Sequence, residues 1–369
     1  MPHELSPDLA ERRCGVPARY GSARVWFNQT SATTVFSIRE LKANPEARGV
    51  TIICTHRDAA SPLFQVADRW SVEPGDLAGD EYVDWALEFC AGECVDVLVP
   101  RREIAAIARR AGEFDAAGTR VLVATTSRFD ELEDKAGTYR VASALGIPVP
   151  RFEVAFDHDT YVRAYHALAG AGHRVCHKPV RGIGGRGFRL VADRDRRADE
   201  LLGTSDLREI TLVETEALLR GPGDVPKLIV SEYLPGPEYS VDCLAQDGDL
   251  LDAVVRVKTG GQVQHIVDEP ALVGHARSLA GAFSLDSLFN VQFRDADNPR
   301  LLEVNPRAAA GLHHSDAVYQ LWEAIRLTLG AERRPTPTPR PGAVWSLPAA
   351  ERMRDVRAAE IPTVEPART

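Results

Sequence analysis

The sequence predicts an α/β fold at the N-terminus and an α+β fold in the rest of the chain. Up to about residue 127, short apolar segments alternate with segments of helical periodicity, which is typical of a parallel sheet with crossover helices. After residue 150, apolar segments instead follow one another across glycine-, proline- or polar-rich turns, which indicates β-hairpins. The length of 369 residues is consistent with two to three domains.

The first predicted domain spans residues 20–127 and contains an open parallel sheet. Strands are expected at 24–28, 50–56, 94–100 and 119–125, and helices at 30–44, 80–93 and 103–118. The second strand is rich in β-branched residues, and the second helix carries apolar residues at helical spacing. No G-x-G-x-x-G motif follows the first strand, so this domain does not need to bind a dinucleotide.

Residues 128–150 are predicted to form a helical connector, because apolar and small residues recur at helical spacing until "GIPVP" ends the pattern. A second unit spans 151–235, and a third unit with two hairpins and a closing helix spans 236–330. The tail at 331–369 is rich in Pro, Arg and Thr. We expect one strand in it, near 343–348, and a disordered or draped end.

Composition excludes several classes of protein. The net charge of −9 argues against a global electrostatic attraction to nucleic acid or to an anionic membrane. No apolar stretch reaches the length of about 18 residues that a transmembrane helix needs, and the N-terminus lacks the apolar core of a signal peptide. Cys90 and Cys94 are close in sequence, but no second pair or histidine completes a zinc site. We therefore expect a cytoplasmic protein that binds any polyanionic ligand in a local basic pocket.

A glycine-rich segment, "KPVRGIGGRGFRL", covers residues 178–190 and contains the pattern G-x-G-x-x-G from Gly182 to Gly187. A dinucleotide-binding turn must open a helix, whereas residues 188–193 alternate like a strand. The segment is therefore predicted to be the tip of a hairpin. Two interpretations stay open: a mobile lid whose backbone N–H groups bind phosphates, or an ordinary loop. Lys178, Arg181 and Arg186 favour the lid.

Four segments occur in a fixed order: Lys135 in the connector, "HKPVRGIGGRGF", "VSEYLPGPEYSVD", and "FNVQF" followed by "LLEVNPR". Together, over about residues 20–330, they resemble the ATP-grasp enzymes, and specifically the carbamoyl-phosphate-synthase-like branch. The resemblance implies a Rossmann-like pre-ATP-grasp domain followed by an ATP-grasp fold, in which two α+β subdomains grip ATP. The unit at 151–235 would be the small subdomain with the glycine-rich lid, and the unit at 236–330 the large subdomain with the metal site.

Three residues are candidate metal ligands on this resemblance. Glu303 and Asn305 are two apart on one predicted strand, so their side chains face the same side. Gln292 lies on the preceding strand and is within reach across the hairpin. A carboxylate and two amide oxygens suit Mg²⁺ that also binds nucleotide phosphates. The alternative is a polar-faced hairpin at the surface.

The resemblance also implies roles for other residues. Lys135, Lys178 and the lid glycines Gly182, Gly184, Gly185 and Gly187 would contact the phosphates. The backbone of a hinge at Glu232, Tyr233 and Leu234 would contact adenine, and Glu238 would bind the ribose hydroxyls. Arg307 would contact the transferred phosphoryl group. Arg256 and Lys258 are two apart on one strand and would face the phosphates, unless that face is solvated. Whether His313 or His314 contacts substrate stays open.

The implied function is that of a stand-alone carboxylate–amine ligase with ATP and Mg²⁺, or Mn²⁺ in its place, as cofactors. A small carboxylate would be phosphorylated and then joined to an amine, with release of ADP and phosphate. The chain carries one such module, whereas carbamoyl phosphate synthetase carries two and biotin carboxylase adds a further domain. The alternatives are a phosphotransferase and a nucleotide-binding regulator. We expect small-molecule substrates, no nucleic acid or membrane partner, and a homodimer.

Overall fold

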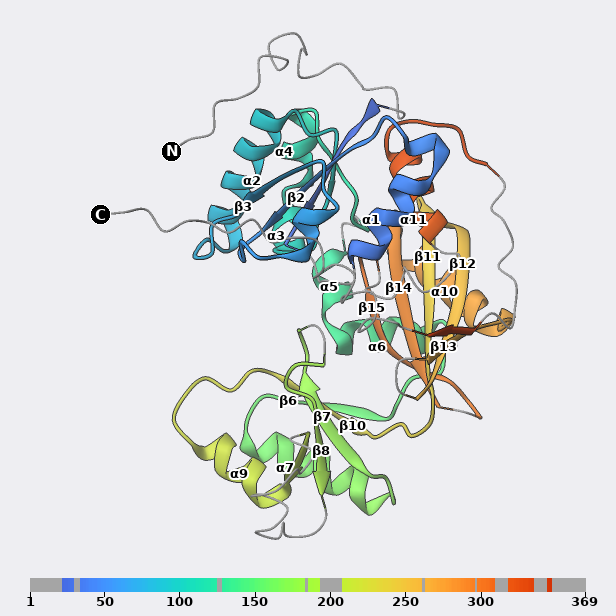
Figure 1. Cartoon of the computed structure of the whole chain (residues 1–369). Coiled ribbons are helices and arrows are strands. Elements are labelled where there is room, and N and C mark those ends of the chain that lie inside the picture. Colours follow the sequence, from blue (N-terminus) through green and yellow to red (C-terminus); the bar gives the residue numbers. More distant parts are fainter. Residues whose placement is uncertain are drawn as a thin grey trace.

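The computed structural model describes residues 22–29, 34–124, 128–182, 185–192, 208–260, 263–295, 297–308, 318–334 and 344–346. The strands in these ranges form three sheets of five, five and six strands (Figure 1). The first sheet lies at the N-terminal end of the molecule, and the second and third sheets face each other across the site described below. Each described helix falls short of the length and apolar character that a membrane span requires.

The first sheet is entirely parallel, as the sequence predicts, and has the order β3-β2-β1-β4-β5. Its strands are β1 (Arg24–Asn28), β2 (Thr51–His56), β3 (Arg69–Val72), β4 (Val97–Val99) and β5 (Arg120–Val121), joined by α1 (Thr34–Ala43), α2 (Gly79–Glu93), α3 (Ile104–Arg109) and α4 (Ala111–Ala116). The strand order reverses between β1 and β4, so the carboxyl ends of these two strands meet at a topological switch point.

Two details of this sheet differ from the prediction. Strand β3 was not expected, because it is a short edge strand whose Trp70 is 55% exposed, and its sequence therefore lacks the apolar character of a buried strand. The helix predicted at 103–118 is two helices, which meet at Arg110. Arg110 leaves helical geometry there, with a φ of −107° and a ψ of 18°.

The connector contains α5 (Phe129–Glu133) and α6 (Lys135–Ala144). Asp134 caps α6 by accepting a hydrogen bond from the Gly137 N–H, which satisfies one of the donors left free at a helix N-terminus. Lys135 is consequently the first residue of α6, at a defined position in the fold. The helix is held against the third sheet by Tyr139, whose hydroxyl donates to the Leu302 carbonyl at 2.8 Å.

The second sheet has the order β6-β10-β7-β8-β9. Its elements are β6 (Phe152–Ala155), α7 (His158–Gly170), β7 (Val175–Pro179), β8 (Arg189–Ala192), β9 (Glu209–Thr211), α9 (Leu212–Arg220) and β10 (Leu228–Glu232). β7 and β8 are antiparallel neighbours, so the prediction that the glycine-rich segment joins two strands of a hairpin is confirmed. β9 and α9 were not predicted.

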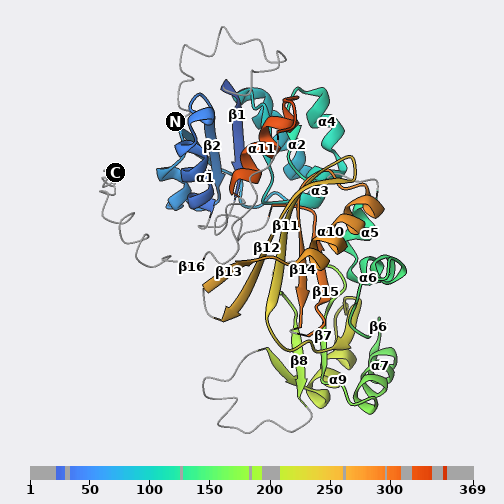
Figure 2. The same ribbon diagram turned by 90° about the vertical axis from the view of Figure 1, so that its right-hand side faces the viewer.

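The third sheet is antiparallel and has the order β15-β14-β11-β12-β13-β16. Its strands are β11 (Glu238–Gln246), β12 (Asp249–Gly260), β13 (Val263–Val267), β14 (Ser287–Arg294), β15 (Arg300–Asn305) and β16 (Val344–Ser346), with the helices α10 (Pro270–Phe283) and α11 (Val318–Thr328). Figure 2 shows α10 and α11 beside this sheet, with α11 close to α1 of the first sheet. β16 confirms the strand predicted in the tail.

Two apolar clusters hold these layers together. One joins the first and third sheets through α11, because Phe27 and Ile38 share a buried cluster with Leu288, Trp322 and Ile325. The other lies under α10 and α6 and is rich in phenylalanine. The first and third sheets therefore share a continuous core, which positions the carboxyl ends of β1 and β4 relative to β15.

A buried histidine on β7 makes the stability of the second sheet depend on pH. Burial, together with the nearby positive charge of Arg189, lowers the pKa of His177 to about 4, and its Nδ1 lies 2.8 Å from the Tyr161 hydroxyl. The unfolded chain, in which a histidine has a pKa near 6.5, binds the extra proton more readily. The stabilising contribution is thus complete above pH 6.5 and is lost as the pH falls towards about 4.

We predict that the free energy of unfolding of the wild type falls by about 3 kcal/mol more than that of His177→Gln between these two pH values. Chemical denaturation of both proteins across this range measures the difference. Parallel pH profiles would contradict the assignment.

Candidate active site

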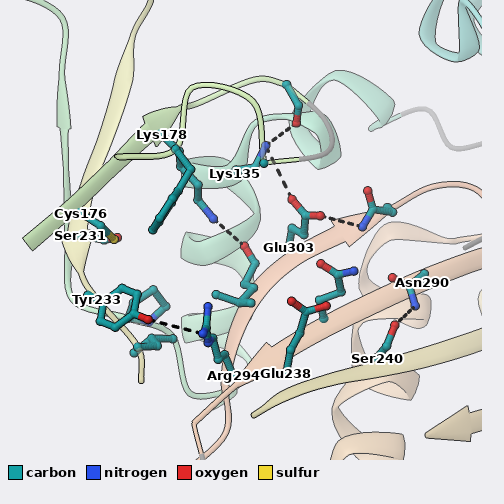
Figure 3. Close-up of a pocket in the computed structure, with 18 of the residues that line it drawn as sticks. Lys135, Cys176, Lys178, Ser231, Tyr233, Glu238, Ser240, Asn290, Arg294 and Glu303 are labelled. Atoms are coloured by element: carbon teal, nitrogen blue, oxygen red, sulfur yellow. Dashed lines mark hydrogen bonds and ion pairs between the residues drawn. The ribbon is translucent and has the colours of Figure 1, made fainter. Parts of the chain in front are cut away.

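The second and third sheets enclose a cavity of about 790 Å³ (Figure 3). Its lining contains most of the residues that the sequence singled out, from segments far apart in the chain. They are Lys135, Lys178, Gly182, Gly185, Glu232, Tyr233, Leu234, Glu238, Arg256, Lys258, Gln292, Glu303, Asn305 and Arg307. Gly184, His313 and His314 lie outside the described residues. The structure therefore brings the predicted residues together, while their individual roles stay predictions.

Gly187 does not line the cavity, although it belongs to the predicted lid. It adopts a φ of +72°, and a Cβ atom there would lie 2.7 Å from Pro179 Cδ. Both facts require glycine for reasons of backbone geometry and close packing. Gly187 is thus explained by the turn that brings the chain back into β8.

Two lysines meet at one end of the cavity. Lys135 Nζ donates to the Gly182 carbonyl at 2.7 Å and lies 4.0 Å from Glu303 Oε2. Lys178 Nζ donates to the Leu302 carbonyl at 3.1 Å and to the Tyr139 hydroxyl at 3.3 Å. Burial lowers the pKa of both lysines, and the charge of Glu303 partly opposes this effect. Such incompletely neutralised cations suit a bound polyanion.

The candidate metal ligands lie on neighbouring strands. Gln292 of β14 is directly opposite Glu303 of β15, and Asn290 is opposite Asn305. Asn305 Nδ2 donates to Glu303 Oε1 at 3.1 Å, and Arg307 Nη2 donates to Asn305 Oδ1 at 3.3 Å. Asn290 and Asn305 are buried, and Gln292 and Glu303 are half-buried in the wall of the cavity, which argues against a hairpin on the open surface.

This donor set fits a hard divalent cation. Among the described residues, no group of three His, Cys, Asp or Glu side chains could hold a metal, so a cation here would bind one carboxylate and the amide oxygens beside it. Oxygen ligands of this kind, with phosphate oxygens and water completing the shell, are characteristic of Mg²⁺ sites. The residues present are therefore compatible with the predicted metal.

The hinge segment uses most of its own polar groups for structure. The N–H of Glu232 donates to the Arg151 carbonyl at 3.0 Å, and the N–H of Tyr233 donates to the Arg174 carbonyl at 2.7 Å. The Glu232 carboxylate accepts from the Arg151 N–H at 2.7 Å and from Arg300 Nη1 at 2.6 Å. Of the three hinge residues, Leu234 is therefore the one whose N–H is best suited to a ligand.

Glu238 and Lys258 form an ion pair at 2.6 Å across β11 and β12. Both side chains are partly exposed to the cavity, so the pair can exchange partners when a ligand enters. The charge of Lys258 is already matched by Glu238 in this arrangement. A ligand that forms a hydrogen bond with one member of the pair would thus free the other member.

Arg256 has a different environment from Lys258, although both lie on β12. It is 1% exposed, which excludes the alternative of a solvated strand face. Its Nε donates to Asp242 Oδ2 at 2.6 Å, its Nη2 to Asp242 Oδ1 at 3.1 Å, and its Nη1 to Gln264. Ser240 and Asn290 complete this network, since Asn290 Nδ2 donates to the Ser240 hydroxyl at 2.9 Å. Arg256 thus forms part of the cavity wall with its donors engaged.

Several lining residues were not predicted from the sequence, among them Tyr139, Cys176, Asn290 and Arg294. Three of them could have been found from the strand period of two. Cys176 lies two residues before Lys178, and Asn290 and Arg294 flank Gln292 at the same spacing. Arg294 lies over the Tyr233 ring at 5.4 Å and helps to position it (Figure 3). Tyr139 carries no such signal, because only the packing of α6 brings it to the cavity.

Comparisons with known proteins support the resemblance. Residues 224–343 match the family model described as ATP-grasp in the biosynthetic pathway with Ter operon. The arginine-specific carbamoyl phosphate synthase large chain of Halalkalibacterium halodurans is 25% identical over 325 residues, which cover 83% of this chain and 28% of that relative. The chain thus spans less than a third of the length of this relative. The prediction of an ATP-grasp domain similar to carbamoyl phosphate synthase is confirmed.

Solved structures share the fold. The biotin carboxylase domain of the Hydrogenobacter thermophilus 2-oxoglutarate carboxylase, crystallised with MgADP and bicarbonate, has a TM-score of 0.63 at 17% identity, covering 87% of this chain and 73% of that domain. The L-amino acid ligase of Bacillus licheniformis has a TM-score of 0.56 at 15% identity, covering 82% of this chain and 74% of that enzyme. These likenesses confirm the predicted fold class.

We predict that Asp242→Asn lowers the free energy of unfolding by about 3 kcal/mol, because it leaves the Arg256 guanidinium buried without its carboxylate. Denaturant titration checks this value. The control is Glu113→Gln, which removes a carboxylate from an exposed pair with Arg110 and should change stability little. The assignment of Arg256 to the cavity wall would be overturned if Asp242→Asn were as stable as the control.

Proposed function

We propose that this chain, which carries an ATP-grasp domain, uses ATP and Mg²⁺ to phosphorylate a small carboxylate and then joins it to an amine, releasing ADP and phosphate. One observation carries the proposal: a single cavity between two sheets collects the buried Lys135, the half-buried Lys178, a carboxylate with amide neighbours, and an arginine. That combination matches the needs of a triphosphate with its metal. The activities named for the relatives are consistent with this reaction class.

The nucleotide would extend from the hinge to the two lysines. The Leu234 N–H and the hinge carbonyls would bind adenine, and Glu238 would exchange Lys258 for the ribose hydroxyls. Lys135 and Lys178 would bind the phosphates, and the N–H groups near Gly182 and Gly185 would cover them. Support comes from the positive φ angles of Gly182 and Gly185, +141° and +68°, which allow close backbone approach to a ligand.

Glu303, Gln292 and Asn305 would hold Mg²⁺ together with phosphate oxygens. When bound, the metal would neutralise phosphate charge and orient the reacting groups. The residues of the chain contribute fixed positive charge from Lys135, Lys178 and Arg307 around the transferred phosphoryl group. Because this charge is already oriented before substrate arrives, little reorganisation is needed during the reaction.

The reaction balances without a covalent enzyme intermediate. A carboxylate oxygen of the substrate attacks the γ-phosphorus, the bond to the β-phosphate oxygen breaks, and ADP leaves. The amine nitrogen then attacks the acyl carbon, phosphate leaves, and the nitrogen loses a proton. An acyl phosphate hydrolyses in water, so the cavity must exclude solvent at this stage, a role that suits the glycine-rich hairpin. We include the predicted domain boundaries, the cytoplasmic location and the homodimer in this proposal.

The test is an ADP-release screen of the purified chain with amino acids and small carboxylates, singly and in pairs. ADP formation that requires both a carboxylate and an amine supports the ligase. Formation with the carboxylate alone indicates a phosphotransferase, and the absence of turnover with intact ATP binding indicates a regulator.

Glu303→Gln should lower Mg²⁺-dependent kcat about 100-fold, the scale of losing a key electrostatic contact, whereas Glu113→Gln should not. Near-normal turnover in Glu303→Gln would overturn the metal assignment.

Glu238→Ala should raise the KM for ATP and leave kcat at saturation nearly unchanged, because ribose is held equally in the ground and transition states. Steady-state kinetics with varied ATP measures the split. Lys258→Ala is the matched control, since it breaks the same ion pair and keeps the carboxylate. If both variants raised KM equally, the effect would come from the lost pair and the ribose role would fail.

A further inference from the structure

A second group of cations lies where the first sheet meets the end of β15. Arg101 follows β4 at the topological switch point of the first sheet, and Arg307 follows β15. In open α/β sheets, ligands bind outside the carboxyl ends of the strands at this point. The segment after β15 covers it, because Ala124 N donates to the Pro306 carbonyl at 3.2 Å and Arg101 Nη1 to the Ala308 carbonyl at 2.6 Å.

The two guanidinium groups converge on one oxygen. Arg307 Nη1 donates to the same Ala308 carbonyl at 3.3 Å, so two full positive charges share one neutral acceptor. Within the described ranges, neither arginine forms an ion pair, although the negative charge of Glu303 acts on Arg307. Arg101 Nε is also buried and has no hydrogen-bond partner there. Donors therefore remain available for an additional acceptor.

The neighbouring Arg102 has the contacts expected of an arginine with a structural role. Arg102 Nη1 lies 3.1 Å from Glu73 Oε1 and donates to the Pro74 carbonyl at 2.7 Å, so its charge is matched. The Arg101 backbone N–H donates to Asn28 Oδ1 at 2.5 Å, and its side chain donates to the neutral Ala308 carbonyl. Asn28 is fully buried and also bonds Tyr82. The loop is thus fixed by buried hydrogen bonds, while the Arg101 side chain shares the Ala308 carbonyl with Arg307 and has no anionic partner among the described residues.

The electrostatics of the pair favour an anion. Burial and the charge of Arg307 lower the pKa of Arg101 to about 10. Bringing the two charges together in a buried place costs free energy that a bound anion would offset. Guanidinium groups bind carboxylate and phosphoryl oxygens through paired hydrogen bonds, which identifies the class of ligand.

We propose that Arg101 and Arg307 together bind a carboxylate or phosphoryl group of the non-nucleotide substrate. That the anion belongs to a substrate rests on the function proposed above, whereas the anion site itself rests on the geometry of the two arginines. Arg307 also lines the main cavity beside Asn305, so the anion lies at the phosphate end of the nucleotide. The first sheet thereby supplies a residue of the substrate site.

Isothermal titration calorimetry with acetate and with inorganic phosphate, each in low-chloride buffer, tests the site. ADP and Mg²⁺ are added so that the lysines of the main cavity are occupied. We expect the wild type to bind at least one of the two anions, and Arg101→Gln to weaken that binding about tenfold or more, the scale of a lost hydrogen bond to a charged group. Acetate binding identifies a carboxylate, and phosphate binding alone identifies a phosphoryl group.

Two variants serve as controls. Arg120→Gln removes the same charge from an exposed pair with Asp115 and should keep the wild-type affinity. Arg101→Lys keeps the charge but loses the forked donor, so its affinity should be intermediate; it also replaces Arg101→Gln if that protein does not fold. Equal affinity in Arg101→Gln and wild type, or no binding of either anion by the wild type at millimolar concentration, would overturn the proposal.

The result of the anion titration does not depend on the proposed function. Arg101 does not line the nucleotide cavity, so ATP should bind Arg101→Gln as it binds the wild type. If the wild type bound no ATP, the proposed function would fail, and the anion titration would still be carried out without ADP. A loss of ATP affinity in Arg101→Gln equal to its loss of anion affinity would overturn a separate anion site.

Discussion

The antiparallel pairing of β14 with β15 determines most of the candidate active site. It sets Gln292 opposite Glu303 and Asn290 opposite Asn305, so the oxygen ligands on the two strands face one cavity. A slip of one residue would turn all of these side chains into the opposite layer, against α10. The register is held by the apolar residues that alternate with them, since Val291, Phe293 and Val304 are buried in the cluster under α10. The core therefore enforces the geometry of the site.

Charge balance organises the rest of the cavity. Glu303 is close to Lys135 and influences the pKa of Lys178 and of Arg307, so one carboxylate faces three cations. Arg256, by contrast, is matched by Asp242, and Lys258 by Glu238. Three cations and one carboxylate thus lie at one end of the cavity, where a polyanion and its metal would be stabilised. At the hinge, the Glu232 carboxylate is paired with Arg300, and Arg294 lies over the Tyr233 ring.

The first sheet also helps to position the residues at the end of β15. Its core is continuous with that of the third sheet through α11, which holds the carboxyl ends of β1 and β4 against the segment after β15. Asn28 fixes the backbone of the loop after β4 from beneath. This rigid contact explains how an arginine more than two hundred residues from Arg307 can share an acceptor with it.

The sequence by itself determined the parallel first sheet, the hairpin around the glycines, and about half of the residues that line the cavity. These follow from local signals: the period of a strand, the turn residues, and the order of short motifs. It did not reveal β3, whose exposed edge position weakens its apolar pattern, or β9 and α9. Only the tertiary structure decided how each charge is matched, because ion pairs such as Arg256 with Asp242 depend on the register between strands. For the same reason it alone separated Gly187, which packs on Pro179, from the glycines that face the cavity, and brought Arg101 to Arg307.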